Sequence, residues 1–137
     1  MKNSSRIPDA EAQSLVEFAL ILPIIVLFII GIFDLGFAVY TRNILASAAR
    51  EGARTGIIMA NNDAMIQTRV KAAAPGLNLQ NSQISIVPSP SRSFSNPITV
   101  TVSYTYTTIT PFLGQVVGNG GKVPLSGRSV MIVEGVQ

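Results

Sequence analysis

A long apolar run near the N-terminus constrains this chain most strongly. Residues 18–33 are 16 residues without a charged side chain, and Glu17 stands directly before them. As an α-helix they would be about 24 Å long, whereas a bilayer core of about 30 Å needs about 20 residues. The run can extend past Asp34 through apolar residues to Tyr40, which suits an aromatic belt. The sequence therefore predicts a transmembrane helix over residues 15–40.

Small residues continue the helical pattern beyond the predicted membrane span. Ala48, Gly52 and Gly56 repeat at every fourth position, and no proline occurs between Pro23 and Pro75. We predict one helix over residues 13–60, about 70 Å long. Small side chains let another backbone approach closely. This face packs either against the chain's own sheet or against a helix of another subunit, and the sequence leaves both alternatives open.

The remainder of the chain has the pattern of a small α+β domain. Asn62 and Asp63 supply helix N-cap chemistry, and Pro75-Gly76 ends the helix that follows. Apolar and hydroxylated residues then alternate, as in an antiparallel strand with one solvated face. The predicted elements are a second helix at 63–74 and strands at 84–87, 98–107 and 125–133. The predicted fold class is α+β and pilin-like: a long N-terminal transmembrane helix, a short second helix and an antiparallel sheet of three to four strands.

The composition argues against several classes of function. The chain has neither Cys nor His, which removes thiol chemistry, the commonest general base and the commonest metal ligand. Its acidic residues form no spaced catalytic pair and no metal-binding signature. The ten Lys and Arg residues are spread along the chain, unlike the dense basic patch of a nucleic-acid-binding protein. We therefore predict no enzyme activity, no catalytic residue, no cofactor, no metal site and no nucleic-acid partner.

The charges that flank the apolar run bear on topology. Lys2 and Arg6 precede it, whereas Arg42, Arg50 and Arg54 follow it. Taken alone, this count weakly favours a cytoplasmic C-terminal side. The strand-rich region instead resembles an exported domain. The apolar region is also longer than that of an ordinary cleaved signal peptide. We predict a single pass through the cytoplasmic (inner) membrane, with lipid as a partner and an extracytoplasmic domain at 61–137.

Three stretches of the sequence resemble one protein family. Residues 13–23 (Gln-Ser-Leu-Val-Glu-Phe-Ala-Leu-Ile-Leu-Pro) are similar to the N-terminal signature of TadE-like proteins. Residues 31–36 resemble its second part, in which a Gly and an acidic residue end the apolar run, and residues 48–54 resemble its third. TadE-like proteins are pseudopilin or minor-pilin components of tight-adherence (Flp-type) pilus systems. The three motifs occur in order and at the expected spacing.

This resemblance implies processing by a prepilin peptidase, a membrane-embedded aspartic peptidase that cuts on the cytoplasmic side of the apolar segment. Prepilin motifs place a Glu fifth in the mature chain. Glu17 is fifth if Gln13 is first, so the implied cut falls between Ala12 and Gln13. Residues 1–12 would then be a cytoplasmic leader. Gly usually precedes such a cut, whereas Ala12 stands here.

Two acidic residues are candidates for roles in assembly. A carboxylate near lipid requires a cationic partner, and the new α-amino group of a neighbouring subunit would pair with Glu17 and set the axial register. Alternatively, Glu17 reaches the cytoplasmic headgroups. Asp34 is an intramembrane or interface acid, which lies at the outer membrane interface or pairs with Arg42 of a neighbouring subunit.

The resemblance implies a non-enzymatic pilin-like subunit that takes part in the assembly or structure of a tight-adherence, type IV-like pilus. Its implied partners are other pilin-like subunits in a homo- or hetero-oligomer, the pilus-assembly machinery and a prepilin peptidase. Two alternatives remain open. The chain could be a single-span anchor that carries an extracytoplasmic binding domain, or it could be a major filament subunit.

Overall fold

The computed structural model describes residues 9–59, 62–89, 93, 95–110 and 119–133. It contains two α-helices and three strands in α+β order, which confirms the predicted fold class. The elements are α1 (Asp9–Ile58), α2 (Asp63–Ala73), β1 (Ile84–Val87), β2 (Pro97–Thr107) and β3 (Lys122–Ile132), with short 3₁₀ helices η1 (Asn81–Gln83) and η2 (Asn119–Gly121). Parts of the predicted leader and domain, residues 1–8 and 134–137 among them, lie outside the described residues.

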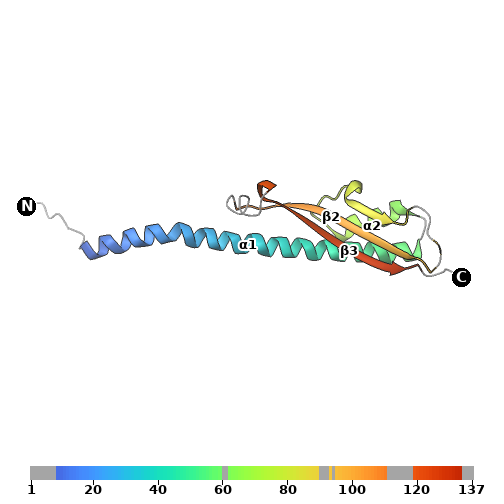
Figure 1. The fold of residues 1–137 in the computed structure, drawn as a ribbon, viewed down its shortest axis with the longest axis horizontal. Helices are drawn as coiled ribbons and strands as arrows, with labels where there is room; N and C mark the ends of the chain where they lie inside the picture. The colour runs from blue at the N-terminus through green and yellow to red at the C-terminus, as the bar shows by residue number, and fades with distance from the viewer. Residues whose placement is uncertain (1–8, 60–61, 90–92, 94, 111–118, 134–137) are drawn as a thin grey trace, which may run out of the picture.

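Helix α1 dominates the shape of the molecule. Its 50 residues correspond to about 75 Å, and its first half projects away from the rest of the fold (Figure 1). The helix continues through Pro23 without a break. It begins before the predicted boundary at residue 13, because Ala10, Glu11 and Ala12 are themselves good helix formers.

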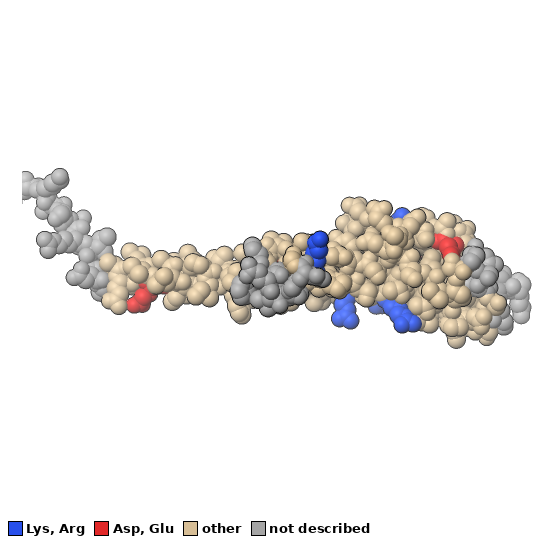
Figure 2. Space-filling view, turned by 45° about the horizontal axis from the view of Figure 1, so that its top comes forward, with Lys and Arg blue, Asp and Glu red and all other residues tan. Residues whose placement is uncertain are grey.

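The projecting half has the properties of a membrane span. Among the described residues, α1 is the one helix long and apolar enough to cross a membrane, and its most apolar 18-residue window is not buried at all. On the face seen in Figure 2, no charged side chain is visible on the rod between the acidic start of the helix and the basic side chains over the domain. This exposure of apolar surface is what lipid contact requires and what water disfavours.

The sheet packs on the second half of α1. Its strand order is β1-β2-β3, and both pairs are antiparallel. Ile98, Val100 and Val102 alternate along β2 and are fully buried. The residues between them, Thr99 and Thr101, are half-buried, and Ser103 beyond them is exposed. The apolar face of the sheet therefore forms the core together with α1 and α2, and the other face is solvated.

Helix α2 packs against α1 and contributes its apolar residues to this core. Its first turn is capped by Asn62, whose side-chain Oδ1 accepts a 3.0 Å hydrogen bond from the backbone N–H of Met65. Ile66 and Val70 lie one turn apart on its inner face and are fully buried. The predicted capping segment thus begins α2, and its buried face lies with α1 and β2 in one core.

Seven residues of α1, separated alternately by three and four positions, form a stripe on the side of the helix that carries the domain. The stripe is buried or half-buried along its length and comprises Gly31, Asp34, Ala38, Thr41, Leu45, Ala48 and Gly52. The N-terminal end of the stripe lies at Gly31, and Thr110 of the domain lies beside the same part of α1. The predicted span at 15–40 therefore overlaps the domain-bearing part of the helix over roughly its last three turns.

Candidate functional site

Asp34 joins the long apolar helix α1 to the domain. It is 2% exposed, although it lies within the apolar segment of α1. Its Oδ1 accepts hydrogen bonds from the hydroxyl of Tyr106, at 3.0 Å, and from the backbone N–H of Ile109, at 2.9 Å. Its Oδ2 accepts the backbone N–H of Thr110 at 2.8 Å, and the Thr110 hydroxyl also donates to it. The carboxylate is thus surrounded by four donors.

This arrangement satisfies a buried charge with neutral donors. Hydrogen bonds to a charged group are stronger than those between neutral groups, so the end of β2 is held firmly against α1. Burial, followed by the hydrogen bond with Asp34 and the negative charge of Asp34, raises the pKa of Tyr106 above its usual value of 10. The Tyr106 hydroxyl therefore remains protonated and acts as a donor at neutral pH.

From the sequence, Asp34 is expected either at the outer membrane interface or paired with Arg42 of a neighbouring subunit, and these partners within its own chain are not predicted. The donors lie 72 to 76 residues away along the chain, and no helical or strand period relates positions so far apart. The available signal was local: the alternating pattern of β2 ends with Tyr106 and Thr107, and Thr110 follows shortly afterwards. That pattern does not indicate which carboxylate the hydroxyls meet.

The small-residue face of α1 lies against the chain's own core. Ala48 is fully buried. A Cβ atom added to Gly52 would overlap Cγ2 of Val70 on α2 and lie 3.2 Å from Cγ1 of Val100 on β2. One added to Gly56 would overlap Ile98. In this structure the face serves the packing of α2 and β2 onto α1, the first of the two alternatives that the sequence left open.

The implied processing site lies in the first turns of α1. Ala12, Gln13 and Glu17 are all helical and exposed. The side-chain Nε2 of Gln13 donates a 3.2 Å hydrogen bond to Oε1 of Glu17, one turn away.

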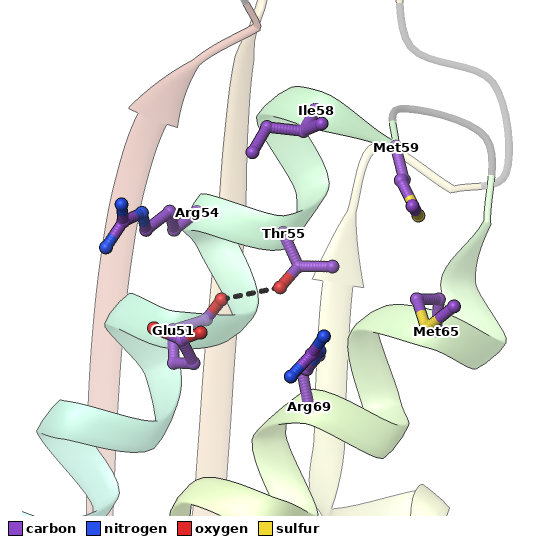
Figure 3. A pocket seen from close by; sticks show the side chains of 7 residues that line it. All are labelled: Glu51, Arg54, Thr55, Ile58, Met59, Met65 and Arg69. Carbon is purple, nitrogen blue, oxygen red and sulfur yellow. Dashed lines mark hydrogen bonds between the residues drawn. The ribbon is translucent and has the colours of Figure 1, made fainter.

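A shallow hollow separates the end of α1 from the start of α2 (Figure 3). Its volume is about 230 Å³, and it is lined by Glu51, Arg54, Thr55, Ile58, Met59, Met65 and Arg69. The Thr55 hydroxyl already donates a 3.0 Å hydrogen bond to the Glu51 carbonyl. Arg54 extends away from α2, whereas Arg69 points toward Thr55. This lining does not pair a nucleophile with a base, and the described residues hold no cluster of acidic ligands for a metal ion.

The fold and the Asp34 contacts define a class of protein: one helix, among the described residues, long and apolar enough for a membrane, with an α+β domain hydrogen-bonded to it near its middle. The model of the TadE-like protein family matches residues 12–54. This match confirms the resemblance seen in the sequence, and it covers just under a third of the chain, all of it on α1. No curated protein and no solved structure matches the chain.

Proposed function

We propose that this protein is a non-enzymatic, single-pass subunit that takes part in the assembly or structure of a tight-adherence pilus. Residues 15–40 anchor it in the cytoplasmic membrane, and the domain at 61–137 lies on the extracytoplasmic side. One observation carries the proposal. The TadE-like match spans the unburied apolar half of α1 and continues into the half that carries the domain. A soluble protein would not leave that apolar half exposed.

Three segments at the N-terminal end of the chain have separate roles: the leader, Glu17 and the apolar span. The leader at 1–12 is removed by a prepilin peptidase, which creates a new α-amino group on Gln13. Glu17 pairs with the α-amino group of a neighbouring subunit, because a carboxylate at the edge of lipid is stabilised by a cation. The exposed apolar surface of the span then meets lipid and the spans of other pilin-like subunits.

Processing is the first testable prediction. Co-expression with a prepilin peptidase is expected to remove residues 1–12, so that the intact mass of the membrane-extracted protein corresponds to a chain beginning at Gln13. An Ala12→Leu variant is the matched control, because a large side chain should block a cut that requires a small residue before it. An unchanged mass for the wild-type chain would contradict processing and favour a simple membrane anchor with a binding domain.

The second prediction concerns Glu17. Glu17→Ala is expected to reduce association between subunits while leaving membrane insertion intact, because removal of the charge favours insertion by at most about 3 kcal/mol. Co-purification of two differently tagged copies measures association, and the membrane-extracted fraction measures insertion. Glu11→Ala is the control, since that exposed acid lies in the leader. Wild-type association of the Glu17→Ala variant would exclude the register role.

The two alternatives predict different behaviour. A single-span anchor with a binding domain would keep its leader and would not require Glu17 for association. A major filament subunit would be processed in the same way, but it would be the most abundant protein in purified pili. Quantitative mass spectrometry of sheared pili therefore separates the major from the minor role.

A further inference from the structure

The residues that follow β2 contact α1 near the middle of the helix, at Asp34. The backbone N–H groups of Ile109 and Thr110 bond to the carboxylate of Asp34, so residues 108–110, here called the tip, are held at the level of Asp34. Thr110 also borders a hollow of about 300 Å³ on α1, whose other lining residues are Ile24, Leu27, Phe28, Gly31, Ile32 and Leu35. The tip is therefore continuous with the apolar surface of the span.

The length of the span places this level inside the bilayer. Glu17 and Asp34 are 17 residues apart, which corresponds to about 25 Å of helix. The hydrocarbon core is about 30 Å thick. If Glu17 lies at one boundary of the core, the other boundary falls about 5 Å beyond Asp34, near Phe37. Helix tilt shortens the span along the membrane normal and moves that boundary farther along α1.

The tip has the chemistry that this depth requires. The Ile109 side chain is 69% exposed, which is unfavourable in water and favourable among acyl chains. Irregular backbone is tolerated at membrane depth only where its polar groups are satisfied within the protein. Asp34 accepts the N–H groups of Ile109 and Thr110, and the carbonyl of Gly121 accepts the N–H of Thr108 at 2.9 Å. All three N–H groups of the tip thus have partners.

The residues just beyond the tip suit the headgroup region. Lys122 begins β3 opposite Thr107, and it is exposed. A lysine at this level can reach lipid phosphates with its ammonium group. Tyr40 is 62% exposed and lies about 9 Å beyond Asp34 along α1, where aromatic side chains favour the interface. The order along the membrane normal is therefore apolar at Ile109, then cationic and aromatic.

We propose that the tip inserts into the lipid leaflet on the domain side, with Ile109 among the acyl chains and an acyl chain in the hollow beside Thr110. Asp34 is then a positioning residue, whose carboxylate supplies the acceptors that the tip backbone lacks in lipid. This inference rests on the membrane-span part of the proposed function and is independent of any role in pilus assembly. The domain thereby gains a second attachment to the membrane besides α1 itself.

Single-tryptophan variants test the insertion, because the chain has no native Trp. The full-length variants Ile109→Trp, Phe28→Trp and Ser103→Trp are reconstituted separately into phosphatidylcholine vesicles with bromine atoms at a shallow or a deep acyl position. Bromine quenches tryptophan fluorescence at short range. Phe28 is 73% exposed within the span, and Ser103 is an exposed residue of β2 six positions from Ile109, so they serve as the buried-in-lipid and water-facing controls.

The expected result is at least about twofold quenching of the Ile109→Trp variant by shallow bromines, strong quenching of Phe28→Trp by deep bromines, and no quenching of Ser103→Trp. Quenching of the Phe28 variant without quenching of the Ile109 variant would overturn the inference while the span stands. The same result would be obtained if a second copy of the chain, rather than lipid, covered the tip. Absence of quenching in both variants would overturn the membrane span as well. Adding Asp34→Asn to the Ile109→Trp variant should weaken the shallow quenching.

Discussion

Replacing Asp34 with Leu is expected to release the end of β2 from α1 while the helix stays in the membrane. The substitution removes the acceptor of four donors, which come from Tyr106, Ile109 and Thr110. The two hydroxyls can turn to other acceptors, but the two backbone N–H groups cannot. A buried donor left without a partner costs about 1–3 kcal/mol. Insertion of the helix should not suffer, because Leu is favoured over Asp in lipid.

Amide hydrogen exchange in detergent micelles measures this release directly. The amides of Ile109 and Thr110 should lose at least about tenfold in protection, since 1.4 kcal/mol corresponds to a factor of ten. Asp34→Asn is the matched control: it keeps the shape and one acceptor oxygen, so its loss should be intermediate. Core amides such as that of Val100 should change less. Wild-type protection of both tip amides in the Leu variant would show that Asp34 does not hold the tip.

Gly127→Ala is expected to destabilise the whole domain, because β3 crosses α1 backbone to backbone at this residue. A Cβ atom added to Gly127 would overlap the backbone carbonyl of Leu45 and lie 2.5 Å from the backbone N of Ala46. A helix backbone cannot rotate aside as a flexible side chain can. Overpacking typically costs about 1–3 kcal/mol, occasionally more, and we expect a cost at the upper end of that range.

Thermal unfolding in detergent micelles, followed by circular dichroism, measures this cost. For a domain of this size, each 1 kcal/mol lowers Tm by about 4–8 °C. Gly36→Ala on α1 is the matched control, because a Cβ atom there has no neighbour within 4 Å. Its Tm should stay unchanged or rise slightly, since Ala is the better helix former. Equal Tm values for Gly127→Ala and the wild type would show that β3 and α1 do not approach this closely.

The secondary structure could be predicted because its signals are local. The apolar run and the small-residue repeat predicted one long helix, and the alternation from Ile98 to Thr107 predicted β2. Periods of 3.6 and 2 residues depend only on neighbours along the chain. Helix α1 runs over Asp9–Ile58 rather than the predicted 13–60, because a periodic pattern defines the face of a helix more sharply than its ends. The start of β3 at Lys122 rather than Leu125 reflects pairing with β2, which extends the strand through Pro124.

The sequence by itself determined the long apolar helix, the order of elements and the similarity to TadE-like proteins, because each rests on residues close together in the chain. Tertiary structure decided what the special residues of α1 contact. Gly52 and Gly56 face α2 and β2 of their own chain, and Asp34 faces donors from the end of β2. A small residue permits close approach by any backbone, and a carboxylate accepts any donor. Only the folded chain selects the partner, since folding brings together residues more than 70 positions apart.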